Sequence, residues 1–179
     1  MKVLIPLAEG FEEIEAVTVI DLLRRAGIEV TSAGLDKGPV VASRGVVLIP
    51  DTELDSVLDA AFDMLVLPGG AGTKHLREDP RILSLVKRMN QEGKWVAAIC
   101  AAPSVLAVSG ILEGRRATSF PGSLEACGHP NEGTPLFRDG NIVTSRGPGT
   151  AMDFALELVE ILSGREKRQE VEEGLKRDF

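Results

Sequence analysis

KWVAAICAAPSVLAV, residues 94–108, is the stretch that decides the fold. Residues 95–99 form an apolar run typical of a buried strand, and residues 103–109 are typical of a helix. Cys100 therefore lies where a strand runs into the first turn of a helix. There, the positive end of the helix dipole and free backbone N–H groups favour a thiolate over a thiol. We predict a nucleophilic thiol with a lowered pKa, against the alternative that Cys100 is one more small core residue.

Strands and helices alternate along the rest of the chain. Apolar runs predict strands at residues 2–7, 28–33, 64–67, 95–99, 117–119 and 141–144, and part of a small hairpin at 46–49. Helices are expected at residues 12–26, 55–62, 80–91, 103–109 and 150–162. The alternation predicts an α/β fold with a doubly wound, mostly parallel sheet and helices on both faces. In such folds ligands bind at the carboxyl ends of the strands, where residues 8–15, 69–70 and 100–101 fall.

Length and composition narrow the class of protein. The 179 residues are 44% hydrophobic, enough for one core, so we expect a single domain over residues 1–179. The formal net charge is -7 and the basic residues are scattered, so nucleic acid is not an expected partner. Glu9, Glu12 and Glu13 follow the apolar N-terminus directly, and no apolar stretch reaches the length of a membrane span. We expect a cytoplasmic protein without a signal peptide.

Neither a metal site nor a disulfide is expected. The chain has few possible metal ligands of the cysteine and histidine type: Cys100, Cys127, His75 and His129. The run from Cys127 to His129 is too short for a structural zinc site. A structural disulfide is unusual in a reducing cytosol. We interpret Cys127 as a loop thiol or a partly exposed thiol, with resolution of an oxidised Cys100 as an alternative role.

Five segments carry a family resemblance. In chain order they are AEGFEEIE at 8–15, LLRRAGI at 22–28, LPGG at 67–70, AICAAP at 98–103 and TSRGPGT at 144–150. Together they resemble the ThiJ/PfpI superfamily, and within it the branch of the parkinsonism-associated protein deglycase and its bacterial relatives. The resemblance implies a flavodoxin-like fold, similar to class I glutamine amidotransferases. It also implies that Cys100 is the nucleophile and Glu15 its paired carboxylic acid.

Glu15 illustrates what the resemblance adds. From the sequence alone it is a solvated acid in the first turns of a helix, whereas the resemblance makes it a buried carboxylic acid with a raised pKa that relays a proton. Gly69 and Gly70, with the amide of Ala101, are predicted to stabilise an oxyanion, although a tight turn explains the two glycines equally well.

Two arginines are expected accessory residues. Arg24 ends a helix, where a cation suits the dipole. The resemblance implies that arginines near Arg24 and Arg44 meet at a subunit interface and hold small anions, since relatives are typically homodimers.

The expected function is that of a glyoxalase or deglycase that needs no cofactor, metal or glutathione. Its substrates would be methylglyoxal, glyoxal or their glycation adducts. An oxidative-stress sensor or holdase chaperone that uses oxidation of Cys100 is the alternative. An amidase or peptidase is less well supported, because Ala101 stands where such relatives often carry a histidine. The resemblance also implies that Phe120 replaces a histidine of the better-known animal relatives.

Overall fold

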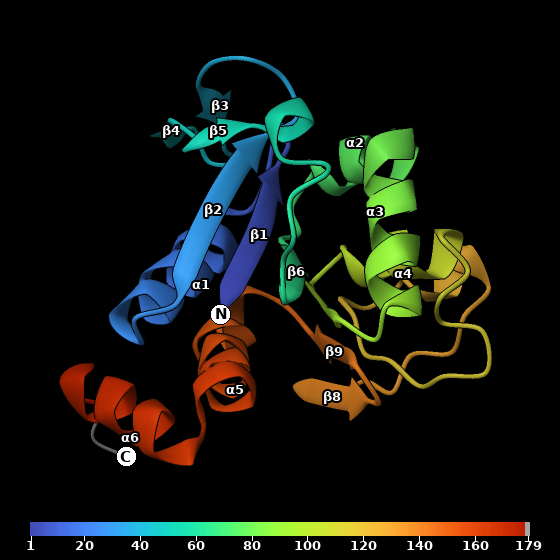
Figure 1. Ribbon diagram of the computed structural model, residues 1–179. Helices are drawn as coiled ribbons and strands as arrows, with labels where there is room; N and C mark the ends of the chain where they lie inside the picture. Colours follow the sequence, from blue (N-terminus) through green and yellow to red (C-terminus); the bar gives the residue numbers. More distant parts are fainter. Residues whose placement is uncertain (178–179) are drawn as a thin grey trace.

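The computed structural model describes residues 1–177 and is built on a seven-stranded sheet (Figure 1). The strand order is β5-β2-β1-β6-β7-β9-β8, and neighbours are parallel except for the antiparallel pair of β8 and β9. The strands are β1 (Lys2–Leu7), β2 (Glu29–Gly34), β5 (Thr52–Glu53), β6 (Met64–Leu67), β7 (Trp95–Ile99), β8 (Leu136–Asp139) and β9 (Ile142–Ser145). The predicted doubly wound, mostly parallel sheet is confirmed.

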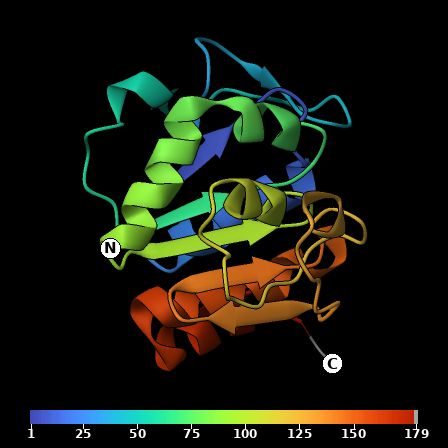
Figure 2. The same ribbon diagram turned by 90° about the vertical axis from the view of Figure 1, so that its right-hand side faces the viewer.

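Helices cover both faces of this sheet (Figures 1 and 2). One face carries α1 (Glu13–Arg25), α5 (Ala151–Ser163) and α6 (Arg165–Gly174). The other face carries α2 (Thr73–Glu78), α3 (Pro80–Gln91) and α4 (Pro103–Val108). A separate antiparallel hairpin, β3 (Val40–Val41) and β4 (Val47–Leu48), agrees with the hairpin expected near residues 46–49.

The central strands are buried on both faces. Along β1, Val3 and Ile5 pack toward α1 and α5, whereas Leu4 packs toward the opposite helices, and all three are fully buried. A strand covered on both faces reads as a continuous apolar run, because side chains alternate between the two faces. This is why β1, β6 and β7 could be predicted from composition.

Two predicted elements are absent. Residues 117–119 do not form a strand, because the N–H of Thr118 donates to Thr144 Oγ1 and that of Ser119 to Asn131 Oδ1. Residues 55–62 do not form a helix either. They contain the end of one short 3-10 turn, η1 (Leu54–Ser56), followed by isolated turns.

The loops after β1 and β6 interlock and form the base of the site. Phe11 makes an isolated bridge with Gly70, the Glu12 N–H donates to the Gly69 carbonyl at 3.0 Å, and the Gly72 N–H donates to the Gly10 carbonyl at 2.8 Å. These contacts fix the start of α1 against the end of β6. No helix within residues 1–177 is both long enough and apolar enough to cross a membrane.

Candidate active site

Cys100 occupies a strained turn at the end of β7. Its φ is 63°, in the left-handed region that residues with a side chain rarely adopt. Its N–H donates to the Ser145 carbonyl at 2.9 Å, and its carbonyl accepts the Phe120 N–H at 2.8 Å. The residue is 8% exposed. Strain of this kind, held in place by surrounding hydrogen bonds, is typical of functional sites.

Glu15 is fully buried in the first turn of α1. The Gly69 N–H donates to its Oε2 at 2.7 Å, while Oε1 lacks a hydrogen-bond partner among residues 1–177. A methyl group on Gly69 would lie 2.6 Å from Cys100 Cβ and 2.8 Å from Glu15 Oε2. The thiol-bearing residue and the carboxyl group therefore both lie against Gly69, and any side chain at this position would collide with them.

Burial dominates the protonation of both groups. It raises the pKa of Glu15 to about 7, against the opposing effects of the Gly69 N–H and of Cys100. Burial also raises the pKa of Cys100 to about 12, and the negative charge of Glu15 adds to this. Between these values the pair holds one proton, and a thiolate forms when that proton lies on Glu15.

The prediction that a helix terminus lowers the pKa of Cys100 is therefore wrong in direction. Helix α4 is short and begins only at Pro103, so Cys100 lies before its first turn. Backbone N–H groups of Gly70 and Ala101 do lower the thiol pKa, but burial and Glu15 outweigh them.

The three residues predicted to form an oxyanion site are brought to the same place. The backbone N–H groups of Gly70 and Ala101 lower the pKa of the Cys100 thiol, whereas the N–H of Gly69 is taken up by Glu15. Gly70 has a φ of +85°, and a Cβ there would lie 2.5 Å from the Glu12 nitrogen. Both the conformation and the close approach require glycine at this position.

The two predicted accessory arginines lie apart. Arg24 is near the far end of α1, where it pairs with Asp51 at 2.7 Å and donates to the Val30 carbonyl at 3.1 Å. Arg44 is exposed in the turn of the hairpin and lies beside Gly70 at a cavity of about 610 Å³. Within this chain, the structure therefore brings Arg44 but not Arg24 to the cavity beside Gly70.

His75 also lines the cavity beside Gly70, as an exposed residue of α2. The fold of the loop after β6 brings it to the same cavity as Gly70. His129 is engaged elsewhere, with Nε2 at 3.1 Å from the carbonyls of Leu112 and Arg115. Among residues 1–177, no group of three acidic, histidine or cysteine side chains is arranged to hold a metal ion.

Cys127 and Phe120 lie in the long segment between α4 and β8. Cys127 is half-buried in a 3-10 turn, η2 (Glu125–Cys127), as expected for a partly exposed thiol. The Phe120 side chain is half exposed, and the residue contacts Cys100 through the backbone hydrogen bond described above.

Comparison with known proteins identifies close relatives. The sequence model of the DJ-1/PfpI family matches residues 1–161. The chain is 45% identical over 178 residues to Protein dj-1beta of Drosophila melanogaster, covering 96% of this chain and 95% of that protein. It is 38% identical over 165 residues to the glutathione-independent glyoxalase DJR-1.2 of Caenorhabditis elegans, covering 89% and 87%. The solved structure of oxidized Toxoplasma gondii DJ-1 superposes with a TM-score of 0.94 at 36% identity, covering 99% of each chain.

Proposed function

Because the chain belongs to the DJ-1/PfpI family, we propose that it is a cofactor-independent glyoxalase or deglycase. Its substrates are methylglyoxal, glyoxal or their glycation adducts. The observation that carries the proposal is that the buried carboxyl group of Glu15 and the buried residue Cys100 lie together against Gly69. The relative named as a glutathione-independent glyoxalase supports the same chemistry.

The first step forms a carbon–sulfur bond. The Cys100 sulfur, as thiolate, attacks the aldehyde carbon of methylglyoxal, and the electron pair of the carbonyl bond moves to oxygen. Glu15 then gives its proton to that oxygen, which produces a hemithioacetal and a carboxylate. The N–H groups of Gly70 and Ala101 favour the thiolate before the attack.

The second step moves one proton between neighbouring carbons. The Glu15 carboxylate removes the proton from the former aldehyde carbon and returns it to the adjacent carbon, while the hydroxyl proton on the first carbon passes to the ketone oxygen on the second, so that the hemithioacetal becomes a lactoyl thioester. Water then hydrolyses the thioester, releasing lactate and freeing Cys100. A carboxyl group whose pKa is about 7 is suited to both accepting and returning a proton near neutral pH.

The test is lactate formation from methylglyoxal by the purified protein, with a chelator and without glutathione. We expect saturable turnover that is lost in Cys100→Ser and kept in Cys127→Ser, because Cys127 lies outside the pair. Equal lactate formation by the wild-type protein and Cys100→Ser would refute the proposal.

A second candidate function is sensing of peroxide through the same thiol. Glu15 Oε1 is buried without a hydrogen-bond partner in the described part of the chain, so its protonated form has a donor to offer to an oxidised sulfur. Peroxide would transfer one oxygen to the thiolate to give the sulfenic acid and water, and a second peroxide would give the sulfinic acid. A sensor or holdase chaperone shows no saturable turnover of methylglyoxal, which separates the two candidates.

We also propose that two copies of the single domain, residues 1–179, form a homodimer through α1 and the β3–β4 hairpin. Large apolar side chains are exposed on α1 and in or next to β4: Ile14, Val17, Val46, Val47 and Ile49. Exposed apolar residues that gather on neighbouring elements are typical of protein–protein contacts. Sedimentation of Val47→Asp tests this, with Val108→Asp on α4 as the matched control. A dimeric Val47→Asp would contradict the assignment of this surface.

A further inference from the structure

The backbone of Cys100 is held from two sides. The Ser145 carbonyl at the end of β9 accepts its N–H at 2.9 Å, and the Phe120 N–H donates to its carbonyl at 2.8 Å. With these bonds Cys100 keeps a φ of 63°, which costs free energy for a residue with a side chain. A strained conformation persists only where the surrounding structure determines it. Whatever fixes Ser145 therefore also fixes Cys100.

A network of hydroxyl groups fixes Ser145. This residue is fully buried, and its Oγ lies 2.6 Å from Thr150 Oγ1 and 2.9 Å from the Pro135 carbonyl oxygen. Thr150 Oγ1 also accepts the Gly147 N–H at 3.2 Å and lies 2.9 Å from the Gly147 carbonyl oxygen. One hydroxyl group thus joins the end of β9, the 3-10 turn η3 (Pro148–Thr150) and the start of α5.

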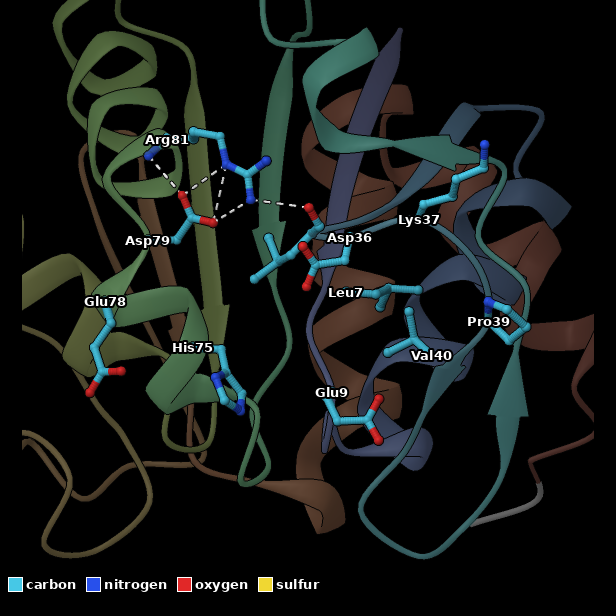
Figure 3. Close-up of a pocket in the computed structure, with 11 residues that line it drawn as sticks. Leu7, Glu9, Asp36, Lys37, Pro39, Val40, His75, Glu78, Asp79 and Arg81 are labelled. Carbon is cyan, nitrogen blue, oxygen red and sulfur yellow. Dashed lines mark hydrogen bonds and ion pairs between the residues drawn. The ribbon is translucent and has the colours of Figure 1, made fainter.

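A second polar network at the carboxyl ends of the strands serves a different part of the fold. It lines a cavity of about 360 Å³, where Arg81 donates to Asp79 at 2.6 Å and to the Leu35 carbonyl at 3.0 Å (Figure 3). These contacts join α3 to the loop after β2, and the residues that line the cavity do not include Cys100. The hydroxyl network at the end of β9, in contrast, ends on the proposed nucleophile.

We propose that Thr150 is a positioning residue, which acts through Ser145 to hold the Cys100 backbone where its side chain meets Glu15. The proposal rests on the proposed function only in taking Cys100 as the nucleophile. Loss of the Thr150 hydroxyl group removes one partner from a buried oxygen and the side-chain acceptor from the Gly147 N–H, and such losses destabilise the arrangement that made them. The turn then relaxes, and the strained Cys100 is no longer held.

Release of Cys100 has two opposite consequences. Burial and the negative charge of Glu15 both raise the pKa of the thiol, so a Cys100 that moves outward forms its thiolate at lower pH. The same movement separates the sulfur from the carboxyl group that moves the proton, so turnover slows. Easier alkylation together with slower turnover is a signature that a general loss of stability does not produce.

The test is the rate of Cys100 alkylation by iodoacetamide as a function of pH. In Thr150→Val, which keeps the size of the side chain, the midpoint of the profile should fall by about one pH unit, and lactate formation should slow about tenfold. Thr150→Ser keeps the hydroxyl group and should restore both. Ser32→Ala is the matched control, because it removes a buried hydroxyl group that bonds to Asp51 at 2.8 Å on β2, which is not a neighbour of β7. It should leave the profile unchanged.

Ser145→Ala provides a second variant, because it removes the other oxygen of the pair and leaves the backbone carbonyl in place. Its effect and that of Thr150→Val should not add in the double variant, since both remove the same hydrogen bond. The proposal is overturned by a wild-type alkylation profile in these variants, by an equal change in Ser32→Ala, or by additive effects. Wild-type protein that forms no lactate would refute the glyoxalase assignment, whereas the alkylation profiles would still decide the role of Thr150.

Discussion

Substitution of Gly69 by alanine is the most direct structural test of the Glu15–Cys100 pair. The φ of Gly69 lies outside the left-handed region, so the backbone accepts alanine and the effect of the substitution is steric. The new Cβ would lie 2.6 Å from Cys100 Cβ, 2.8 Å from Glu15 Oε2 and 3.0 Å from the Ile99 carbonyl oxygen. The Cys100 Cβ and the Ile99 oxygen are fixed by the backbone, and the Glu15 carboxylate is fully buried and held by the Gly69 N–H, so the groups around the new methyl must shift.

The magnitude follows from the distances. Carbon atoms in contact prefer separations of about 3.5–4.0 Å, so Cys100 must shift by roughly 1 Å. Overpacking of a buried position costs about 1–3 kcal/mol of unfolding free energy. A displacement of about 1 Å between reacting groups lowers a catalysed rate by about 10²-fold. We therefore expect Gly69→Ala to fold with reduced stability and to form lactate about a hundredfold more slowly.

The assay pairs urea unfolding with lactate formation. Gly149→Ala is the matched control, because Gly149 also lies outside the left-handed region and its Cβ would meet open space. This control should leave both measurements unchanged. A Gly69→Ala protein with wild-type stability and wild-type turnover would show that the close packing of Glu15 and Cys100 is not needed.

Three further predictions concern the two titrating groups. Between pH 4.5 and about 7 the folded protein keeps the Glu15 proton, whereas the unfolded chain loses it. The free energy of unfolding should therefore fall by about 3 kcal/mol as the pH rises through this window. Urea titrations of Glu15→Gln should lack that fall, and an identical pH dependence would contradict the assignment. Iodoacetamide should alkylate Cys100 faster in Glu15→Gln than in the wild-type protein at the same alkaline pH, because the variant removes the negative charge that raises the thiol pKa. The alkylation rate of Cys127 is the internal reference. After mild peroxide, mass mapping should find Cys100 as the sulfinic acid in the wild-type protein and in Glu15→Gln, but not in Glu15→Leu, which has no donor for the new oxygens.

The sequence predicted those elements whose own residues form a recognisable hydrophobic pattern. Strands β1, β6 and β7 are continuous apolar runs because both of their faces are covered. In contrast, α6 was not predicted, because its sequence is mostly charged and its contacts come from elsewhere in the chain. Val171 packs into the core, and Arg168 pairs with Glu160 of α5 at 2.7 Å. No local pattern contains that information.

The strand β8 was missed for a similar reason. It is a short edge strand of mixed polarity, paired on one side with β9. Its Arg138 lies over the ring of Trp95, 4.6 Å from the ring centre, which is a contact between distant parts of the chain. Edge strands of this kind lack the continuous apolar run by which the central strands were recognised.

The end of the predicted strand placed Cys100 correctly. The protonation state of its thiol, however, depends on residues that are distant in the sequence. Gly69 is 54 residues from Glu15, and only folding brings the two together. The helix-dipole argument failed because it considered local structure without burial or the neighbouring carboxylate. The family resemblance supplied the partner that local physics could not.

The central claim is that Glu15 carries the proton during turnover at Cys100. The measurement that tests it most directly is kcat/KM for methylglyoxal, followed as lactate, in the wild-type protein and in Glu15→Gln across the pKa of about 7. The wild-type rate should rise through this pKa as the pair reaches its singly protonated form, and the variant should be slower by about 10²- to 10⁴-fold without that rise. A Glu15→Gln protein that folds and turns over at the wild-type rate with the same pH profile would contradict the account.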